Sequence, residues 1–104
     1  MKKTTLTDKI TGKEFQLDEE KVIRIGRSKY NEIITPKVVN IVSRSHAIIA
    51  YNEGLERYVI FDNFSKNGMY VNGIKVDRTV LEGEKEISLG EKGYALKFKE
   101  ENKK

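Results

Sequence analysis

Hydrogen-bond donors suited to an anionic ligand are concentrated in three short stretches of the chain, residues 26–28, 43–46 and 65–68. They supply arginine guanidinium groups, serine hydroxyls, a side-chain amide and backbone N–H groups beside glycine. Phosphate oxygens accept hydrogen bonds from donors of these kinds. The residue types therefore predict a site for a compact dianion, such as a phosphate monoester, which carries about −1.5 to −2 charges at neutral pH.

Two Asn-Gly pairs shape the segment 62–73, in which Asn67-Gly68 and Asn72-Gly73 lie between apolar stretches. Asn-Gly is a strong signal for tight turns with positive φ. Two such turns five residues apart would place amide side chains and backbone N–H groups on one rim, which is the predicted site.

Several other kinds of site are excluded by composition. The chain has no cysteine and one histidine, His46, so disulfides, Cys-based zinc sites and multi-histidine metal sites are not expected. Nucleotide-binding and hydrolase loop motifs are absent. Ser43 and His46 lie three residues apart, but no third orienting group or oxyanion donor is identifiable. We expect neither catalysis nor a cofactor.

The charge balance favours an anionic partner. Lys and Arg total 20 and Asp and Glu total 16, which gives a formal net charge of +4. This excess does not choose among nucleic acid, a membrane surface and a phosphorylated protein. The N-terminal residues lack an apolar signal-peptide region, and no apolar run is long enough to span a bilayer. We expect a cytoplasmic protein without a membrane partner.

The elements that must position these donors are short strands. Apolar and polar residues alternate over segments of two to seven residues, and turn residues separate the segments. The expected strands are 3–7, 14–17, 22–25, 32–35, 46–52, 57–62, 70–71, 74–76, 80–81, 86–89 and 94–99. This pattern predicts one all-β domain over residues 1–100, a sandwich or barrel, followed by a charged tail over 101–104.

Two of these segments, 46–52 and 57–62, have apolar residues at successive positions and are expected to be central strands with little exposure on either face. The aromatic residues expected to be buried include Phe15, Tyr58, Phe61 and Phe98. The pattern breaks over residues 26–44, where Pro36 blocks a regular strand. Four apolar residues of that stretch are expected to fold onto the core: Val38, Val39, Ile41 and Val42.

Four sequence blocks, taken in order, resemble a forkhead-associated (FHA) domain. They are residues 26–27, 31–33, 43–46 and 62–73. The resemblance implies a β-sandwich of about eleven mostly antiparallel short strands, of the SMAD/FHA type, with binding loops at one end. It also implies that these loops bind phosphothreonine peptides.

The resemblance assigns five residues to phosphopeptide binding. Arg27 and Ser43 would hold the phosphate, and Arg44 would lie beside them as a second cationic or backbone donor. Asn67 would hydrogen-bond the peptide backbone next to the phosphothreonine. Lys66 occupies a position where many family members have a threonine or serine that contacts phosphate.

Six further residues are expected to support the site: Gly26, His46, Ser65, Gly68, Asn72 and Gly73. His46 would fix the Ser43 loop through side-chain hydrogen bonds, and Ser65 and Asn72 would brace their own turns. The glycines would permit backbone geometry that a Cβ atom would oppose. Ile41 lies where some members have an arginine that selects an acidic residue, so we expect an apolar or weak preference there.

The predicted function is phosphothreonine-dependent recognition of phosphorylated proteins or peptides in Ser/Thr kinase signalling, without catalysis. Two alternatives stay open. One is a scaffold domain of the same fold that binds its partner independently of phosphate. The other is a basic β-barrel that binds single-stranded nucleic acid, which requires exposed aromatic residues such as Tyr30 and Phe64. The identity of the partner, its kinase and the oligomeric state are left open.

Overall fold

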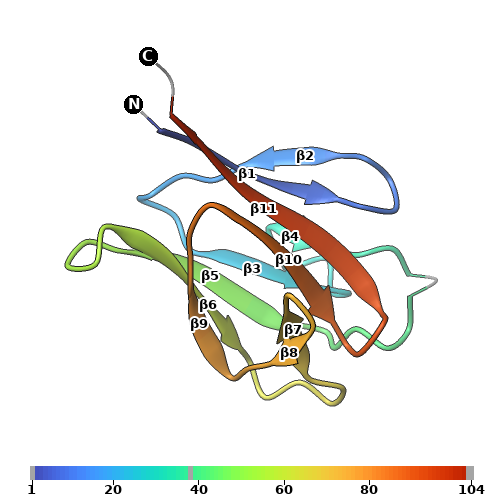
Figure 1. Cartoon of the computed structure of the whole chain (residues 1–104). Coiled ribbons are helices and arrows are strands. Elements are labelled where there is room, and N and C mark those ends of the chain that lie inside the picture. The colour runs from blue at the N-terminus through green and yellow to red at the C-terminus, as the bar shows by residue number, and fades with distance from the viewer. Residues whose placement is uncertain (1, 38, 103–104) are drawn as a thin grey trace.

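The computed structural model describes residues 2–37 and 39–102, which form eleven β-strands in two sheets packed face to face (Figure 1). The strands of the N-terminal half are β1 (Lys2–Asp8), β2 (Glu14–Gln16), β3 (Ile23–Gly26), β4 (Ile33–Ile34), β5 (Ala47–Asn52) and β6 (Arg57–Asp62). Those of the C-terminal half are β7 (Met69–Val71), β8 (Ile74–Lys75), β9 (Arg78–Leu81), β10 (Glu84–Leu89) and β11 (Tyr94–Asn102). Over the described ranges there is no helix, and so none that could cross a membrane.

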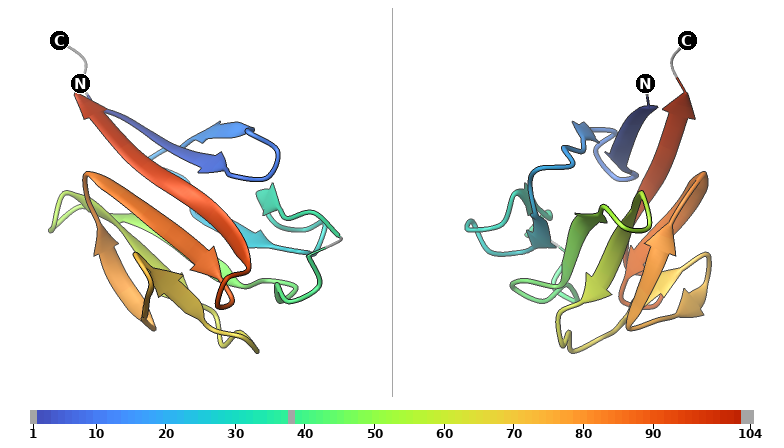
Figure 2. Two further views of the ribbon diagram at one scale, coloured as in Figure 1. Left: turned by 45° about the vertical axis from the view of Figure 1, so that its right-hand side comes forward. Right: turned by 90° about the vertical axis from the view of Figure 1, so that its left-hand side faces the viewer.

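One sheet has six strands in the order β2-β1-β11-β10-β7-β8, and the other has five in the order β4-β3-β5-β6-β9. All neighbouring strands are antiparallel except β3 and β4, which pair in parallel. The two layers are clear in the rotated views of Figure 2. The predicted all-β sandwich is confirmed, and a closed barrel is wrong because the strands form two separate sheets.

The core lies between the sheets and is built mainly from alternate residues of the strands. Its largest fully buried side chains are Tyr94, Phe98, Leu6, Ile25, Ile33, Ile49, Ile60, Met69, Leu81, Ile87, Leu89 and Leu96. Successive side chains of a strand point to opposite faces, so an apolar residue at every second position lines one face. Full burial of each large apolar side chain contributes about 1.5 to 3 kcal/mol.

The prediction that β5 and β6 are central strands is confirmed, but the prediction that Phe61 is buried is wrong. Tyr58 and Ile60 of β6 point into the core, whereas Phe61 lies on the outer face of the five-stranded sheet and is 36% exposed. The apolar run in β6 does not distinguish the two faces of the strand, and the outer face has no covering layer.

The irregular stretch 26–44 folds onto the end of the sandwich. Within it, β4 pairs with β3, and Thr35 N–H donates to Gly26 O (2.9 Å), which holds the stretch against the five-stranded sheet. Val42 is buried in the core and Val39 packs against it. Ile41 is half-buried, and Val38 lies outside the described residues.

The first and last strands pair along their whole length, and Lys2 is the register partner of Asn102. Figure 1 shows the start of β1 beside the end of β11, at the end of the sandwich away from the β6–β7 loop. β11 thus extends two residues into the segment predicted as a charged tail, because β1 offers a pairing edge there. Lys103 and Lys104 lie outside the described residues.

A buried polar contact joins the same two strands. Tyr94 OH donates to Asp8 Oδ2 (2.5 Å), and the N–H groups of Ile10 and Thr11 donate to Asp8 Oδ1 (2.7 and 3.0 Å). Burial raises the pKa of Asp8, but the hydrogen bonds from Tyr94 and the two backbone groups outweigh it and lower the pKa below 3.8. The carboxylate therefore stays ionised and fully bonded inside the fold.

Candidate functional site

The three donor-rich stretches lie in three loops at one end of the sandwich, and backbone hydrogen bonds join the first two. Arg27 N–H donates to Ser43 O (3.2 Å), and Ser28 N–H donates to Arg44 O (3.0 Å). These bonds continue the pairing of β3 with the segment that leads into β5. The β3–β4 loop is therefore fixed against the β4–β5 loop.

Ser43 connects all three loops. Its carbonyl accepts from Arg27 N–H, and its Oγ accepts a hydrogen bond from the backbone N–H of Lys66 (3.1 Å). A serine hydroxyl has one donor and two acceptor positions. Because the Lys66 bond uses an acceptor position, the Ser43 hydroxyl keeps its proton to donate to a ligand.

Arg27 is held at the same point. Its Nε donates to the carbonyl of Val42, the residue before Ser43. The guanidinium makes no other hydrogen bond and no ion pair with described residues. Its terminal nitrogens are therefore oriented by the Nε bond and remain available as donors.

Asn67 lies on the side of the site nearest Ile41. Its Nδ2 donates to Ile41 O (2.7 Å), while its exposed side chain keeps the Oδ1 acceptor without a partner among the described groups. Ile41 itself packs close to Gly90 and Gly93. The amide is thus pre-oriented, and it offers an acceptor to a peptide N–H group.

His46 is fully buried and links the Ser43 loop to the β6–β7 loop. Its Nδ1 accepts from Ser43 N–H (3.1 Å), and its Nε2 donates to Gly68 O (2.7 Å). This pair of bonds requires a neutral ring with the proton on Nε2. Burial lowers the pKa of His46 and outweighs Gly68 O and Asp62, which raise it. Asp62 Oδ1 lies 3.8 Å from Nε2, and beside a neutral ring this contact is not an ion pair.

Two glycines make the loop contacts possible. A Cβ atom on Gly26 would lie 2.2 Å from Arg44 O, so only glycine lets the two loops approach this closely. Gly68 has φ +80, a backbone conformation that favours glycine. Its N–H donates a hydrogen bond to Ser65 Oγ (2.9 Å). Ser65 thus closes the turn to which it belongs.

Asn72 braces more than its own turn. Both Asn72 and Gly73 have positive φ (49° and 82°), as the Asn-Gly pattern predicts for a hairpin turn. In addition, Asn72 Oδ1 accepts from Glu86 N–H and Asn72 N–H donates to Glu86 O, both at 2.8 Å. The β7–β8 hairpin is therefore attached to β10.

Two asparagines take part that the sequence analysis did not assign to the site. Asn31 is buried, and its Nδ2 donates to the carbonyls of Ser28 (2.9 Å) and Arg44 (2.6 Å). Asn63 Nδ2 donates to Ser45 O (3.2 Å). Both hold the Arg44–Ser45 backbone from opposite sides. An asparagine in each polar stretch was visible in the sequence, but nothing there indicated its distant partner.

The rim is cationic, and its charges are not neutralised. Among the described residues, Arg27, Arg44 and Lys66 make no ion pair, whereas Arg24, on the neighbouring strand, is bound by both oxygens of Glu32. That bidentate contact with Arg24 lowers the pKa of Glu32 to about 2. Unpaired cations around a hydroxyl donor favour an anionic ligand.

A cavity of about 810 Å³ lies elsewhere, between the edges of the two sheets. Phe15, Tyr58 and the carboxylates of Asp18 and Glu19 are among its lining residues. Burial, with these carboxylates, raises the pKa of Tyr58 to about 12. An acidic cavity repels a dianion, so the loop end is the better phosphate site. No cluster of three or more His, Asp or Glu side chains in the described ranges could hold a metal ion.

The FHA domain family matches residues 23–90, and the chain belongs to that family. It is 38% identical over 68 residues to the ABC transporter ATP-binding/permease protein Rv1747 of Mycobacterium tuberculosis. That match covers 65% of this chain but 7% of the transporter protein, so the chain spans a small part of that relative.

Solved FHA structures share the fold along nearly the whole chain. The Rv1747 FHA-1 structure of M. tuberculosis has a TM-score of 0.83 at 22% identity, covering 97% of this chain and 98% of that one. M. tuberculosis EmbR in complex with a low-affinity phosphopeptide has a TM-score of 0.77 at 27% identity, covering 93% of this chain and 24% of that one. The FHA domain of FhaA, complexed with the intracellular domain of Rv3910, has a TM-score of 0.76 at 26% identity, covering 94% and 99%.

Proposed function

We propose that this chain is a phosphothreonine-dependent protein-recognition module that acts by binding alone, in Ser/Thr kinase signalling. The observation that carries the proposal is the Ser43 junction. Its hydroxyl keeps a proton to donate, and the loops joined there carry Arg27, Arg44 and Lys66, which make no ion pair with described residues. Membership of the FHA family supports it, as does the phosphopeptide bound to the related EmbR structure. The partner is a threonine-phosphorylated protein or peptide.

Each of the five predicted binding residues has a role in this proposal. The guanidinium of Arg27 and the hydroxyl of Ser43 donate to phosphate oxygens, and Arg44 and Lys66 add positive charge. Asn67 accepts from the peptide backbone through Oδ1. Charge-assisted hydrogen bonds contribute about 1.5 to 3 kcal/mol each, so three or four support micromolar binding after the cost of association. Since protein kinases and their substrates meet in the cytoplasm, we place the chain there.

The proposal is tested by isothermal titration calorimetry with one peptide in three forms: phosphothreonine, phosphoserine and unmodified threonine. We expect micromolar binding of the phosphothreonine form, weaker binding of phosphoserine, and no binding of threonine. Arg27→Ala removes a donor to a charged group and should weaken binding roughly 10- to 150-fold.

Arg78→Ala is the matched control. Arg78 is also an exposed arginine without an ion pair to described residues, but it lies in β9, outside the three donor-rich loops. It should leave the affinity for a short peptide unchanged. Equal affinity for the phosphorylated and unmodified peptides would contradict the proposal and favour the phosphate-independent scaffold. Tight, salt-dependent binding of a single-stranded oligonucleotide instead would favour the nucleic-acid alternative.

A further inference from the structure

The outer faces of the two sheets differ in chemistry. The outer face of the six-stranded sheet alternates lysine and glutamate, and these side chains pair with one another. The ion pairs are Lys3–Glu14 (3.7 Å), Lys9–Glu86 (2.6 Å), Lys97–Glu84 (3.6 Å) and Lys99–Glu101 (3.0 Å). A face covered by paired charges is adapted to water.

The outer face of the five-stranded sheet is apolar at its centre. Strand register places Ile48 of β5 next to Phe61 of β6, and it places Val59 of β6 between Ala50 of β5 and Val80 of β9. None of these five residues belongs to the core between the sheets. We name this set the outer-sheet patch; Phe61 is 36% and Val80 38% exposed.

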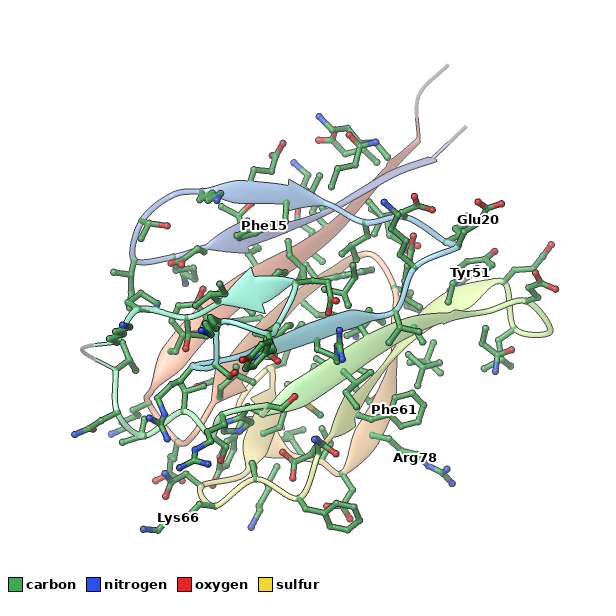
Figure 3. The ribbon with its side chains drawn as sticks, turned by 180° about the vertical axis from the view of Figure 1, so that it is seen from behind. Phe15, Glu20, Tyr51, Phe61, Lys66 and Arg78 are labelled. Carbon is green, nitrogen blue, oxygen red and sulfur yellow. The ribbon has the colours of Figure 1, made fainter. Side chains whose placement is uncertain are left out.

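The patch has an arginine at each side. The register row that contains Ile48 and Phe61 ends in Arg24 on one side and Arg78 on the other. Arg24 is neutralised by Glu32, but Arg78 makes no ion pair with a described residue. Figure 3 shows the side chains of Phe61 and Arg78 projecting next to each other from β6 and β9. Together with Leu55 and Val80 they line a hollow of about 360 Å³.

The patch is continuous with the loop end of the molecule. Phe61 lies one residue before Asp62, which leads into the β6–β7 loop. At position 64 of that loop a phenylalanine is 99% exposed and has φ 53. A bulky side chain in this conformation is uncommon, and an aromatic side chain wholly in water is unfavourable. Along the chain, this exposed Phe64 lies between Phe61 of the patch and Lys66 of the phosphate loop.

The size of the patch indicates what covers it. Three strands about 4.8 Å apart, each with one or two outward apolar residues, give an apolar area of roughly 200 Å². Specific complexes bury about 800 Å² on each partner, so the patch is too small to hold a second copy or any other protein by itself. It can contribute strongly to a protein that is already bound at the loops, because the second contact is then intramolecular.

We propose that the outer-sheet patch is a second docking site for the same threonine-phosphorylated protein that binds at the loops. That protein meets the patch with apolar side chains and places an aspartate or glutamate opposite Arg78. Phe64 bridges the two contacts. The inference rests on the proposed phosphothreonine function and adds a surface outside the phosphate loops to it.

The experiment uses a peptide library with one fixed phosphothreonine and about ten random residues on each side, which reach roughly 30 Å when extended. The library is selected against the whole chain, and the selected peptides are compared with the short phosphothreonine core. We expect apolar residues with Asp or Glu at a constant distance from the phosphothreonine, and affinity at least about tenfold above that of the core.

Three variants test whether the extra affinity of the selected peptides comes from the outer-sheet patch. Phe61→Ser and Arg78→Glu should each remove it while binding of the core peptide stays unchanged, and Arg78→Glu should select basic in place of acidic residues. Lys97→Glu reverses a charge on the opposite sheet and should retain the gain. Arg78 is exposed, so its variant tests the patch even where Phe61→Ser disturbs folding.

The proposal is overturned if selected peptides bind no tighter than the core, or if Phe61→Ser and Arg78→Glu retain the gain. It is also overturned if sedimentation shows a dimer that Phe61→Ser dissociates, because a second copy then covers the patch. If the core peptide fails to bind the unaltered chain, both the phosphothreonine function and the second docking site are overturned. If Arg27→Ala abolishes binding of the core peptide but the longer peptides show no gain in affinity over the core, only the second docking site is overturned.

Discussion

At the scale of single residues, the proposed phosphate site has the charge of Lys66 at a position where the resemblance to FHA domains implies a hydroxyl. The backbone N–H of Lys66 is already used by Ser43 Oγ, so its side chain acts as a point charge on a flexible stem. Such a charge at an exposed site is screened by salt.

Substitution of Lys66 tests this. We expect Lys66→Thr to lower the affinity for a phosphothreonine peptide roughly threefold to fivefold at low ionic strength, with the difference disappearing in high salt. Fluorescence anisotropy titrations at two salt concentrations measure both effects. Lys97→Thr, on the outer face of β11, is the control and should match the unaltered chain. A loss that persists in high salt would mean that Lys66 makes a specific hydrogen bond instead.

His46 makes stability depend on pH in a defined direction. Its folded-state pKa is lowered from 6.5 by burial, so below pH 6.5 the unfolded chain binds a proton that the folded chain does not. The folded state is therefore fully stabilised above pH 6.5. Stability falls as pH drops from 6.5 toward the lowered pKa, by up to about 1.4 kcal/mol per pH unit.

Denaturant unfolding between pH 7.5 and 5 measures this loss. His46→Gln provides the comparison, because a glutamine amide can accept and donate as the neutral ring does but does not titrate. That variant should be less stable at pH 7.5 yet nearly constant over the same range. Since His46 is the sole histidine in the chain, an equal pH dependence in the variant would assign the effect to another group.

At the scale of elements, the approach of the β3–β4 and β4–β5 loops depends on Gly26. A methyl group there overlaps Arg44 O, which is backbone and cannot rotate away. We expect Gly26→Ala to destabilise the fold by about 1 to 3 kcal/mol and to weaken phosphopeptide binding, because the Arg27 and Ser43 contacts separate. Thermal unfolding and calorimetry measure the two effects. Gly54→Ala, in the β5–β6 turn with its nearest neighbouring atom 3.4 Å away, should change neither.

The same elements show how far sequence could predict this structure. The strands and the order of the loops followed from alternation and from turn residues such as Asn72-Gly73, because both act locally. The bonds of Asn31 and Asn63 to the Arg44–Ser45 backbone could not be predicted, since they join residues more than ten positions apart. The exposure of Phe61 could not be predicted either: in a strand that is apolar on both faces, sequence does not show which face is covered.

At the scale of the whole molecule, the Asp8–Tyr94 hydrogen bond joins positions 86 residues apart. Tyr94→Phe would leave a buried carboxylate short of one donor, and it should lower the free energy of unfolding at pH 7 by roughly 1.5 to 3 kcal/mol. Because the folded-state pKa of Asp8 lies below 3.8, this stabilisation is complete above that pH and is lost as pH falls below it. The difference between variant and unaltered chain should therefore shrink in acid.

Urea unfolding at pH 7 and at about pH 2 gives both values. Tyr70→Phe is the control, since Tyr70 is half-buried and its hydroxyl makes no hydrogen bond with described residues. A loss that is equal at both pH values would show that the tyrosine hydroxyl stabilises the fold without the ionised carboxylate.

The pairing of Lys2 with Asn102 has a practical consequence for protein engineering. The start of β1 and the end of β11 lie at one point, away from the loops that carry Arg27, Ser43 and Asn67. Chain ends that lie together favour insertion into a host protein. This domain could therefore be spliced through a single surface turn of an unrelated enzyme, which would make that enzyme's localisation dependent on threonine phosphorylation.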